Sequence, residues 1–455
     1  MMVCCFLIID VVASNLMCLS STDVTNELIS NGNFATESSN DMPKDWSVWN
    51  PVIANTSCSF KASPEGVSVN ALDKPYAVGG ITQEVKGIEG GCAYAVKVDC
   101  ALKNIQFPYR SVFVRVTWMN DGKQLYNCGM LVRGPILDVD LTRFDDVLTA
   151  PNEANGALIS LDVKWLQGGS VIWKKVSMSK TEPIKPRKVK IGTVYLRPSG
   201  GTPEKNLQQC CEQIDDAGKL GLDIVCLGEA LTMAGTPYSV VDCAQSIPGR
   251  DTEILGDAAH RNHIWVVAGL TELDGDIIYN TAVLLDRDGK VAGKYRKVHL
   301  PREEWKQGIT PGSEYPVFQT DFGIVAIQIC YDWFFSEPES IFALKGAEII
   351  FAPTWGNTLP DHDGIADGET VFRVRARDNG VYMVPSVYDG NSMVIDPLGR
   401  ILASNKGKNG VFWAEVDLNK REELDWVGYW RSIGPRHRMV ETYEPLLEYP
   451  QKPTY

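Results

Sequence analysis

The first half of the chain alternates short apolar runs with polar and turn residues. From residue 26 to 180 the β-like runs are YAVGGITQEV, CAYAVKVDC, SVFVRVTWM, ALISLDVKWL and SVIWKKVSM, and Gly, Asn, Asp and Pro separate them. No convincing helical period of apolar residues accompanies these runs. Evenly spaced strands of this kind predict an all-β, antiparallel sandwich.

The second half has a different pattern, in which a helical segment is followed by a buried strand. Thr202 can cap the first helix, and Pro203 occupies a position that favours helix starts. Apolar residues then recur at helical spacing, at Leu207, Cys210 or Cys211, Ile214 and Ala217. The strand-like run LDIVCLGEA follows them. The same order recurs in TEILGDAAHRNHIWVVAGL, SIFALKGAEIIFAP and ADGETVFRVRARDNGVYMVPS, where Gly346 and Gly380 are typical helix ends. The alternation predicts a layered α/β (α+β) domain.

Two hairpin-like segments of this second half are near copies of each other. NTAVLLDRDGKVAGK begins at Asn280 and NSMVIDPLGRILAS begins at Asn391. Asp286 matches Asp396, and a turn glycine closes each hairpin. This internal duplication predicts two similar sheets facing each other in a four-layer α-β-β-α sandwich.

Composition shifts suggest where the domains begin and end. KTEPIKPRK places two prolines among charges and predicts a linker over 181–188, between a β-sandwich over 26–180 and an α/β domain over 189–420.

Residues 1–25 have the length and apolar stretch of an export signal, but they lack a basic start and Asp10 interrupts the apolar run. The sequence leaves open whether the chain is exported, to the periplasm or outside the cell, or stays cytoplasmic. No later window is apolar enough to span a membrane.

Charge and cysteine content restrict the partners. The net charge of −13 in 455 residues repels phosphate backbones, which argues against nucleic acid as a partner. The 12 cysteines include no Cys-x-x-Cys pair with matching histidines, so no structural metal site is expected. Four cysteines of the first half can pair if that half is exported, and otherwise are small buried apolar residues: Cys58, Cys92, Cys100 and Cys128.

Three strand-like runs end on or near a side chain that can carry chemistry. IVCLGEA ends near Glu229, KVAGKYRKVHLP contains Lys297, and IVAIQICYD ends near Cys330. Ligands bind at strand ends in layered α/β folds, so these side chains are expected to converge. A cysteine thiol needs a nearby base or cation to act as a nucleophile, and Glu229 and Lys297 supply both.

These three motifs, in this order and spacing, resemble the Glu-Lys-Cys triad of the nitrilase, or carbon-nitrogen hydrolase, superfamily. The resemblance extends from about residue 188 to 420. It implies the four-layer fold, a homodimer or higher homo-oligomer, and a mechanism that uses no metal or organic cofactor. It also implies a second glutamate that hydrogen-bonds the lysine and orients substrate. Glu304 is favoured for this role and Glu303 is the alternative.

The implied reaction is acyl transfer through a thioester. Glu229 accepts the thiol proton, Cys330 attacks the carbonyl carbon, and Lys297 with the backbone N–H of Tyr331 holds the oxyanion. Glu229 then protonates the leaving amine and activates water. By resemblance, Tyr331 after the cysteine favours a small-molecule amide or N-carbamoyl substrate. Nitrile hydrolysis and acyl transfer on the same triad remain open, and so does a non-catalytic glycan-binding protein.

Two departures from the family pattern bear on substrate fit. Gly228 precedes Glu229 where the family usually has proline, and Ser336 replaces a common proline. The side chains expected to line the substrate site are Tyr331, Trp333, Trp355 and Asn357. His299, two residues after Lys297, is expected to have a structural role.

The two ends of the chain carry further expectations. The stretch NELISNGNFATESSNDMPKDWSVWN resembles the start of carbohydrate-binding jelly rolls, which makes a glycan a candidate partner of the first domain. Trp46 and Trp49 either stack on sugars there or, as the favoured alternative, pack in the sandwich core. The aromatic-rich tail 421–455 resembles tails that contact a partner subunit, and a loosely attached surface tail is the alternative.

Overall fold

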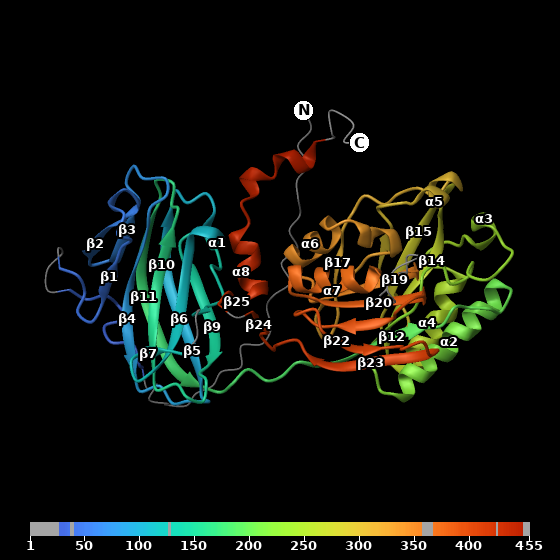
Figure 1. Cartoon of the computed structure of the whole chain (residues 1–455), viewed down its shortest axis with the longest axis horizontal. Helices are drawn as coiled ribbons and strands as arrows, with labels where there is room; N and C mark the ends of the chain where they lie inside the picture. Colours follow the sequence, from blue (N-terminus) through green and yellow to red (C-terminus); the bar gives the residue numbers. More distant parts are fainter. Residues whose placement is uncertain (1–26, 37–40, 126–128, 357–366, 425, 449–455) are drawn as a thin grey trace.

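The computed structural model describes residues 27–36, 41–125, 129–356, 367–424 and 426–448. An N-terminal β region, residues 27–181, and an α/β region, residues 188–417, lie on either side of the C-terminal segment 418–448 (Figure 1). None of the helices in the described part of the chain is long and apolar enough to cross a membrane.

The N-terminal β region consists of two antiparallel sheets around one core. One sheet has the order β1-β4-β10-β6-β7, with β8 paired to β6, and the other has the order β2-β3-β11-β5-β9. Their strands are β1 (Ser47–Trp49), β2 (Ser59–Ser63), β3 (Gly66–Asn70), β4 (Val78–Lys86), β5 (Ala93–Lys103), β6 (Val112–Asn120), β7 (Lys123–Gln124), β8 (Met130–Leu131), β9 (Thr142–Thr149), β10 (Gly156–Lys164) and β11 (Ser170–Thr181). Alternate residues of both sheets, such as Val114 and Val96, share one buried cluster. The jelly-roll connectivity stays a prediction.

Several sequence expectations concern side chains of this region. Trp46 is buried and packs on Phe34 with ring centroids 4.9 Å apart, so it belongs to the core. The half-buried Trp49 donates from its indole N–H to Asp162 at 3.0 Å. Three of the four cysteines, Cys58, Cys92 and Cys100, are free thiols, and Cys128 lies outside the described residues.

The α/β region contains two six-stranded sheets with the same internal order. They run β16-β15-β14-β13-β12-β23 and β17-β18-β19-β20-β21-β22. The strands are β12 (Lys188–Tyr195), β13 (Ile224–Cys226), β14 (Trp265–Asp274), β15 (Ile277–Leu285), β16 (Val291–Arg296), β17 (Val317–Gln319), β18 (Ile324–Ile327), β19 (Ile349–Gly356), β20 (Tyr382–Asp389), β21 (Met393–Ile395), β22 (Ile401–Ser404) and β23 (Gly410–Asp417). In each sheet three parallel strands lead into an antiparallel hairpin.

The two hairpins, β15–β16 and β21–β22, have the same turn, as the duplicated sequence predicts. In the first, Asp286 accepts the backbone N–H of Gly289 at 2.9 Å. In the second, Asp396 accepts that of Gly399 at 2.8 Å. The two glycines have φ angles of +79° and +78°, which other residues adopt only with strain. The predicted internal duplication is therefore confirmed in the turn geometry and in the strand order.

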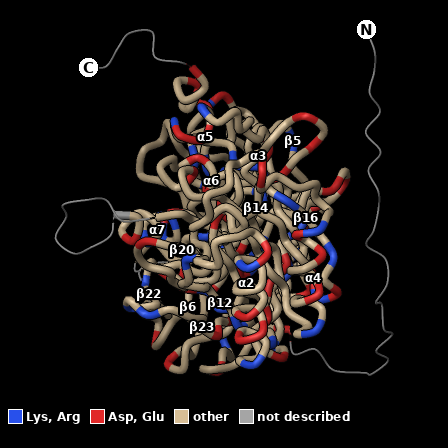
Figure 2. Tube along the Cα trace, turned by 90° about the vertical axis from the view of Figure 1, so that its right-hand side faces the viewer, with Lys and Arg blue, Asp and Glu red and all other residues tan. Residues whose placement is uncertain are grey.

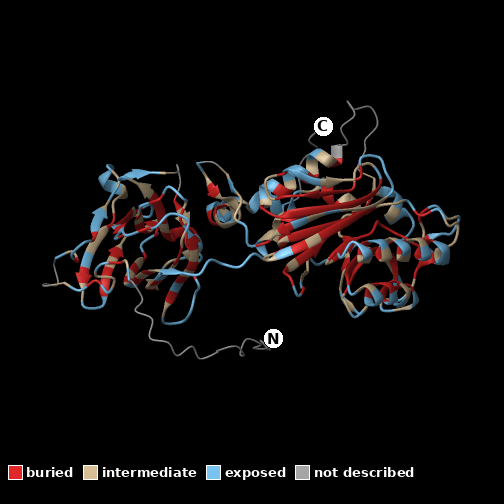
Figure 3. Cartoon of the chain, turned by 90° about the horizontal axis from the view of Figure 1, so that it is seen from below, coloured by how far each residue is buried: buried red, intermediate tan, exposed pale blue. Residues whose placement is uncertain are grey.

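The helices of the α/β region are α2 (Pro203–Lys219), α3 (Val240–Cys243), α4 (Arg250–Asn262), α5 (Arg302–Lys306), α6 (Glu337–Leu344) and α7 (Asp367–Asn379). Apolar residues of α2 and α4 pack on the first sheet, and those of α6 and α7 on the second. Acidic and basic residues are interspersed on α2 and α4 (Figure 2). Buried residues concentrate on the strands (Figure 3). The mixed α/β fold predicted for this region is confirmed.

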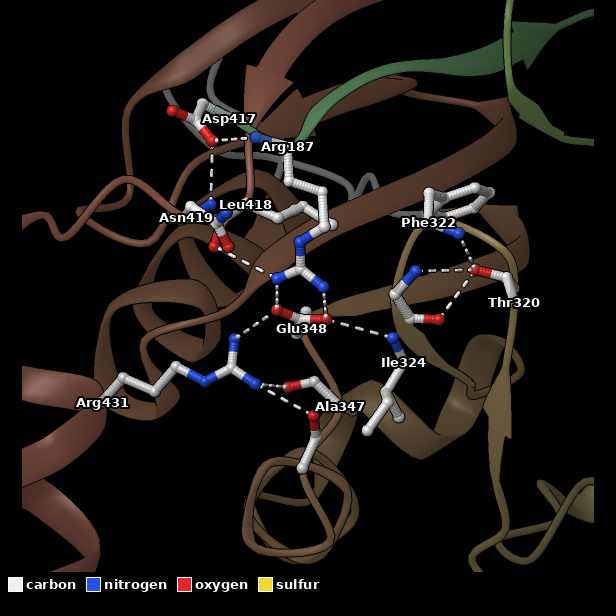
Figure 4. A network of polar contacts seen from close by, with 12 residues as sticks. Arg187, Thr320, Phe322, Ile324, Ala347, Glu348, Asp417, Leu418, Asn419 and Arg431 are labelled. Atoms are coloured by element: carbon white, nitrogen blue, oxygen red, sulfur yellow. Dashed lines mark hydrogen bonds and ion pairs between the residues drawn. The ribbon is translucent and has the colours of Figure 1, made fainter. Parts of the chain in front are cut away.

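The C-terminal segment contacts both regions of its own chain. It contains β24 (Glu423–Leu424), β25 (Gly428–Tyr429), α8 (Trp430–His437) and the short 3-10 turns Val440–Thr442 and Glu444–Leu447. Figure 4 shows Arg431 of α8 donating to the Ala347 carbonyl at 3.0 Å, beside Glu348, which also pairs with Arg187. Toward the β region, Ile433 packs on Phe113 and Leu131. Contact of this segment with a partner subunit stays a prediction.

Candidate active site

Cys330 stands at a sharp turn after a buried strand. β18 ends at Ile327, and Cys330 begins a 3-10 turn, Cys330–Phe334, with its own φ at +40°. A side chain with a Cβ adopts this left-handed conformation only at a cost of about 1–2 kcal/mol. The turn therefore holds the thiol in a position that a regular strand would not give it.

Asp332 fixes the geometry of this turn. Its buried carboxylate accepts the Ile329 backbone N–H at 3.0 Å and the Tyr295 hydroxyl at 2.8 Å. It also accepts the backbone N–H of His299, and the His299 Nδ1 lies 2.8 Å from it. The imidazole of His299 stacks on Phe335 at 4.0 Å. His299 thus contacts the support of the turn and does not border the cavity beside Cys330.

Glu229 lies just beyond β13, where the chain turns through Ala230 at a φ of +45°. Its backbone carbonyl accepts the Tyr388 hydroxyl at 2.5 Å. A Cβ on Gly228 would lie 2.4 Å from the Tyr388 ring. The glycine that replaces the family's usual proline is therefore matched by a tyrosine that fills the vacated space and holds the backbone of Glu229.

Lys297 joins two carboxylates inside the protein. Its Nζ is fully buried and donates to Glu229 Oε1 at 2.9 Å and to Glu304 Oε1 at 2.5 Å. Glu304 is half-buried, whereas Glu303 is exposed. Of the two glutamates considered from the sequence, Glu304 is the one that contacts the lysine.

Asn280 completes this cluster, and the sequence analysis did not assign it a role in the site. Its side-chain amide donates to Glu229 at 2.7 Å and to Glu304 at 3.3 Å. Its backbone carbonyl accepts the N–H of Lys297 at 2.9 Å. The sequence signal for this role was the position of Asn280, a polar residue directly before the run TAVLL.

Burial and the charges of the cluster together determine the protonation of the thiol. Burial alone would lower the pKa of Lys297, but the acidic groups around it, first Glu229, raise it above its ordinary value. Burial raises the pKa of Glu304 more than the adjacent ammonium lowers it. Burial, and then the charge of Glu229, raises the pKa of the Cys330 thiol to about 12. The cysteine is accordingly a thiol at neutral pH, and it needs a base to become a nucleophile.

A cavity of about 440 Å³ opens beside the cysteine. Its lining residues are Glu229, Ala230, Met233, Val240, Thr271, Asn280, Pro301, Glu303, Glu304, Gln307, Ile309, Cys330 and Trp355. Of the side chains expected to line the site, Trp355 does so. Tyr331 instead contacts the rings of Phe334 and Phe335. Trp333 is 3% exposed and packs on Phe372 in the core. Asn357 lies outside the described residues.

Close packing behind Glu229 leads to a testable prediction. A Cβ on Gly269 of β14 would lie 2.7 Å from the Glu229 Cα, so Gly269→Ala should displace this glutamate from the cavity. A misplacement of about 1 Å costs on the order of 100-fold in turnover, and we expect a loss of this size in kcat. Gly156→Ala is the control, because its Cβ would keep 3.5 Å from the nearest atom. Equal kcat for both variants would contradict the packing argument.

Known proteins resemble the α/β region of the chain. The family described as carbon-nitrogen hydrolase matches residues 190–425. A nitrilase from Pyrococcus abyssi is 34% identical over 252 residues, which are 51% of this chain and 93% of that protein. An omega-amidase from Mus musculus is 31% identical over 239 residues, 48% of this chain and 85% of that protein. The crystal structure of a carbon-nitrogen hydrolase from Helicobacter pylori G27 matches 58% of this chain and 99% of its own, with a TM-score of 0.51 and 24% identity.

Proposed function

Because the chain belongs to the carbon-nitrogen hydrolase family, we propose that it hydrolyses a small amide or N-carbamoyl substrate through a thioester on Cys330. The observation that carries the proposal is the position of Cys330 and Glu229 on one cavity, with Lys297 hydrogen-bonded to Glu229. This arrangement supplies a nucleophile, a base and a fixed positive charge at one site.

The first step transfers the thiol proton. Glu229 Oε1 accepts hydrogen bonds from Lys297 and Asn280, whereas Oε2 has no hydrogen-bond partner among the described residues. Oε2 is therefore the oxygen that takes the proton as the Cys330 sulfur bonds to the carbonyl carbon. Because the pKa of the thiol is raised to about 12, proton transfer accompanies attack and no thiolate accumulates beforehand.

The remaining steps return the site to its starting state. As the carbon–sulfur bond forms, the carbonyl oxygen takes the electron pair, and Lys297 and the Tyr331 backbone N–H stabilise the resulting oxyanion. Glu229 gives its proton to the nitrogen as the carbon–nitrogen bond breaks, and ammonia or an amine leaves. Glu229 then takes a proton from water, which attacks the thioester. When the carbon–sulfur bond breaks, the sulfur recovers a proton and the acid is released.

Two other reactions would use the same residues. Nitrile hydrolysis is the first alternative, because one similar protein is a nitrilase. Acyl transfer to an amine in place of water is the second. The Tyr331-Asp332 pair after the cysteine supports the amide reaction through its resemblance to amidase and carbamoylase branches.

The charge of the cavity indicates what kind of acyl group fits. Glu229, Glu303 and Glu304 line it, and no Lys or Arg does so among the described residues. Lys297 lies behind these carboxylates and already pairs with two of them. An acyl group that carries its own carboxylate would lack a cation to pair with, so we propose a substrate whose acyl group is neutral or cationic.

A substrate panel tests the reaction and this preference together. Ammonia release and intact mass would be measured with primary amides whose acyl chains are matched in length and end in a methyl, an amino or a carboxylate group. N-carbamoyl compounds, in which the acyl group is the carbamoyl group itself, would be measured beside them. We expect an acyl adduct on Cys330, and a kcat/KM at least about tenfold lower for the carboxylates. Glu303→Gln should reduce this difference in kcat/KM between substrates, because it removes the exposed carboxylate at the cavity.

Two results would contradict these proposals separately. Turnover that favours the carboxylate-bearing amides would overturn the charge argument but leave the hydrolase proposal standing. Release of ammonia and the carboxylic acid from nitriles alone, with no turnover of any amide, would replace amide hydrolysis by nitrile hydrolysis.

A further inference from the structure

Positive charge gathers at one place in a protein whose net charge is −13. Phe113, Arg115 and Lys164 lie on the outer face of β6 and β10, which α8 covers. The register of β6 and β10 places all three side chains on one face. Arg115 pairs with Ser160 and Phe113 pairs with Asp162, and Lys164 follows Asp162 by two residues along β10. Arg436 of α8 adds its guanidinium over the same Phe113 ring, at 5.9 Å.

The acidic side chains nearby do not match these cations. Asp162 is the carboxylate nearest to Arg115, but its Oδ2 lies 3.9 Å from the Arg115 Nε, too far for a hydrogen bond. The Asp162 Oδ1 already accepts the Trp49 indole N–H. The Arg115 Nε is buried and has no hydrogen-bond partner among the described residues. Glu441 is paired with Arg110 at 2.5 Å.

Unlike Arg115, which forms a long ion pair with Asp162, Lys164 and Arg436 have no carboxylate partner in the described part of the chain. Lys164 lies over the rings of Phe113 and Trp165, at 5.0 and 4.7 Å. Arg436 donates to two backbone carbonyls, those of Tyr109 and Gly134. Burial, followed by the charges of neighbouring arginines, lowers the pKa of Lys164 to about 8. The cations thus repel one another, and a bound anion would relieve this repulsion.

A cavity adjoins the cluster. It measures about 290 Å³ and lies between β6, β8 and the C-terminal segment. Three aromatic rings border it, from Phe113, Trp426 and Trp430, together with the polar side chains of Arg115 and His437. Gly129 leaves room for the Arg115 chain, because a Cβ there would lie 2.5 Å from the Arg115 Cγ. An arginine beside aromatic rings is suited to a carboxylate attached to a ring that can lie against their faces.

We propose that this cavity binds a small organic acid built on a six-membered ring, such as a hexuronic acid. Its carboxylate would accept hydrogen bonds from Arg115, and its ring would lie against Trp426 and Trp430. This site lies on the β region and α8 and shares no lining residue with the cavity beside Cys330. Binding there is a function in addition to the proposed hydrolysis, and either can fail without the other.

Calorimetric titration of the full chain tests the proposal. The probes are glucuronate, glucose, benzoate and inorganic sulfate. We expect glucuronate to bind at least about tenfold more tightly than glucose or sulfate, the effect of one charge-assisted hydrogen bond combined with ring contact. Arg115→Gln should weaken glucuronate about tenfold or more. Arg143→Gln is the matched control, because Arg143 lies on β9 of the other sheet with a side chain 59% exposed.

Each outcome has a defined meaning. Benzoate binding more tightly than glucuronate, with the same loss in Arg115→Gln, would support the site and identify the ring as aromatic. Glucose or sulfate binding as tightly as glucuronate would overturn the proposal, as would an Arg115→Gln variant with unchanged affinity. Lys164→Gln is a second variant, expected to weaken glucuronate as well, if Arg115→Gln melts at a lower temperature than the wild type.

Discussion

Replacing Cys330 with alanine is expected to abolish turnover, by on the order of 10⁴-fold or more, because Cys330 is the one thiol among the described residues that line the cavity. The fold should survive. The turn that holds Cys330 is stabilised by the hydrogen bonds of Asp332, which do not involve the thiol. Deleting one partly buried sulfur atom should cost only about 1 kcal/mol of unfolding free energy. Ammonia release measures the activity, and thermal denaturation measures the fold.

Cys211→Ala provides the matched control for this experiment. Cys211 is also a partly buried thiol, but it lies on α2 and does not border the cavity. Its replacement should leave kcat unchanged. If Cys330→Ala retained turnover, the thioester mechanism would be wrong, whatever the substrate. If both the wild type and Cys330→Ala were inactive on every amide and nitrile, the non-catalytic glycan-binding alternative would gain support.

Local patterns were enough to predict the framework of the site. Glu229, Lys297 and Cys330 each lie at or near the end of a recognisable strand-like run, and the repeated hairpins predict two similar sheets. These signals work because strand ends and turn glycines impose requirements within a few residues of the chain. The predicted roles of the three residues in catalysis remain predictions, since geometry alone does not measure turnover.

Contacts between distant segments were not predictable in the same way. Asn280 looked like the first residue of a hairpin, yet it donates to glutamates 51 and 24 residues away in sequence. Gly228 departs from the family pattern, and the sequence does not indicate that Tyr388, from another strand, packs against it. Trp333 was expected at the substrate because it follows Cys330 closely, but the 3-10 turn directs its ring into the core. Such outcomes depend on which strands become neighbours.

Lys297→Met is expected to have the largest effect on stability as well as to inactivate the protein. The substitution leaves the buried Glu229 and the half-buried Glu304 close together, without the ammonium that pairs with both. Removing one partner from a buried ion pair typically costs about 3–5 kcal/mol, and a loss of this size in unfolding free energy is expected here. Denaturant titration would measure it. Lys219→Met, at an exposed lysine that pairs with Asp216, should show no measurable change.

The pH dependence of this loss gives a second, independent prediction. In the wild type, the pKa of the buried ammonium is raised above its ordinary value, so its contribution is constant below about pH 10. Burial already raises the pKa of Glu304 in the wild type, and Lys297→Met removes the ammonium that lowers it, so the folded-state pKa of Glu304 stays above its unfolded value. This carboxyl then favours the folded state at low pH, and its contribution is lost as the pH rises through the folded value. The loss of unfolding free energy in Lys297→Met, relative to the wild type, should therefore be smaller at pH 5 than at pH 8.

A double variant distinguishes this electrostatic explanation from simple loss of packing. Lys297→Met combined with Glu304→Gln removes one of the two unpaired carboxylates while keeping the volume of the cluster nearly constant. It should recover at least about 1 kcal/mol of the lost stability, since the sites are in direct contact and couple strongly. It should also have a weaker pH dependence than Lys297→Met alone. A double variant less stable than the single one, or a deficit independent of pH, would mean that the lysine stabilises the site through its packing rather than through its charge.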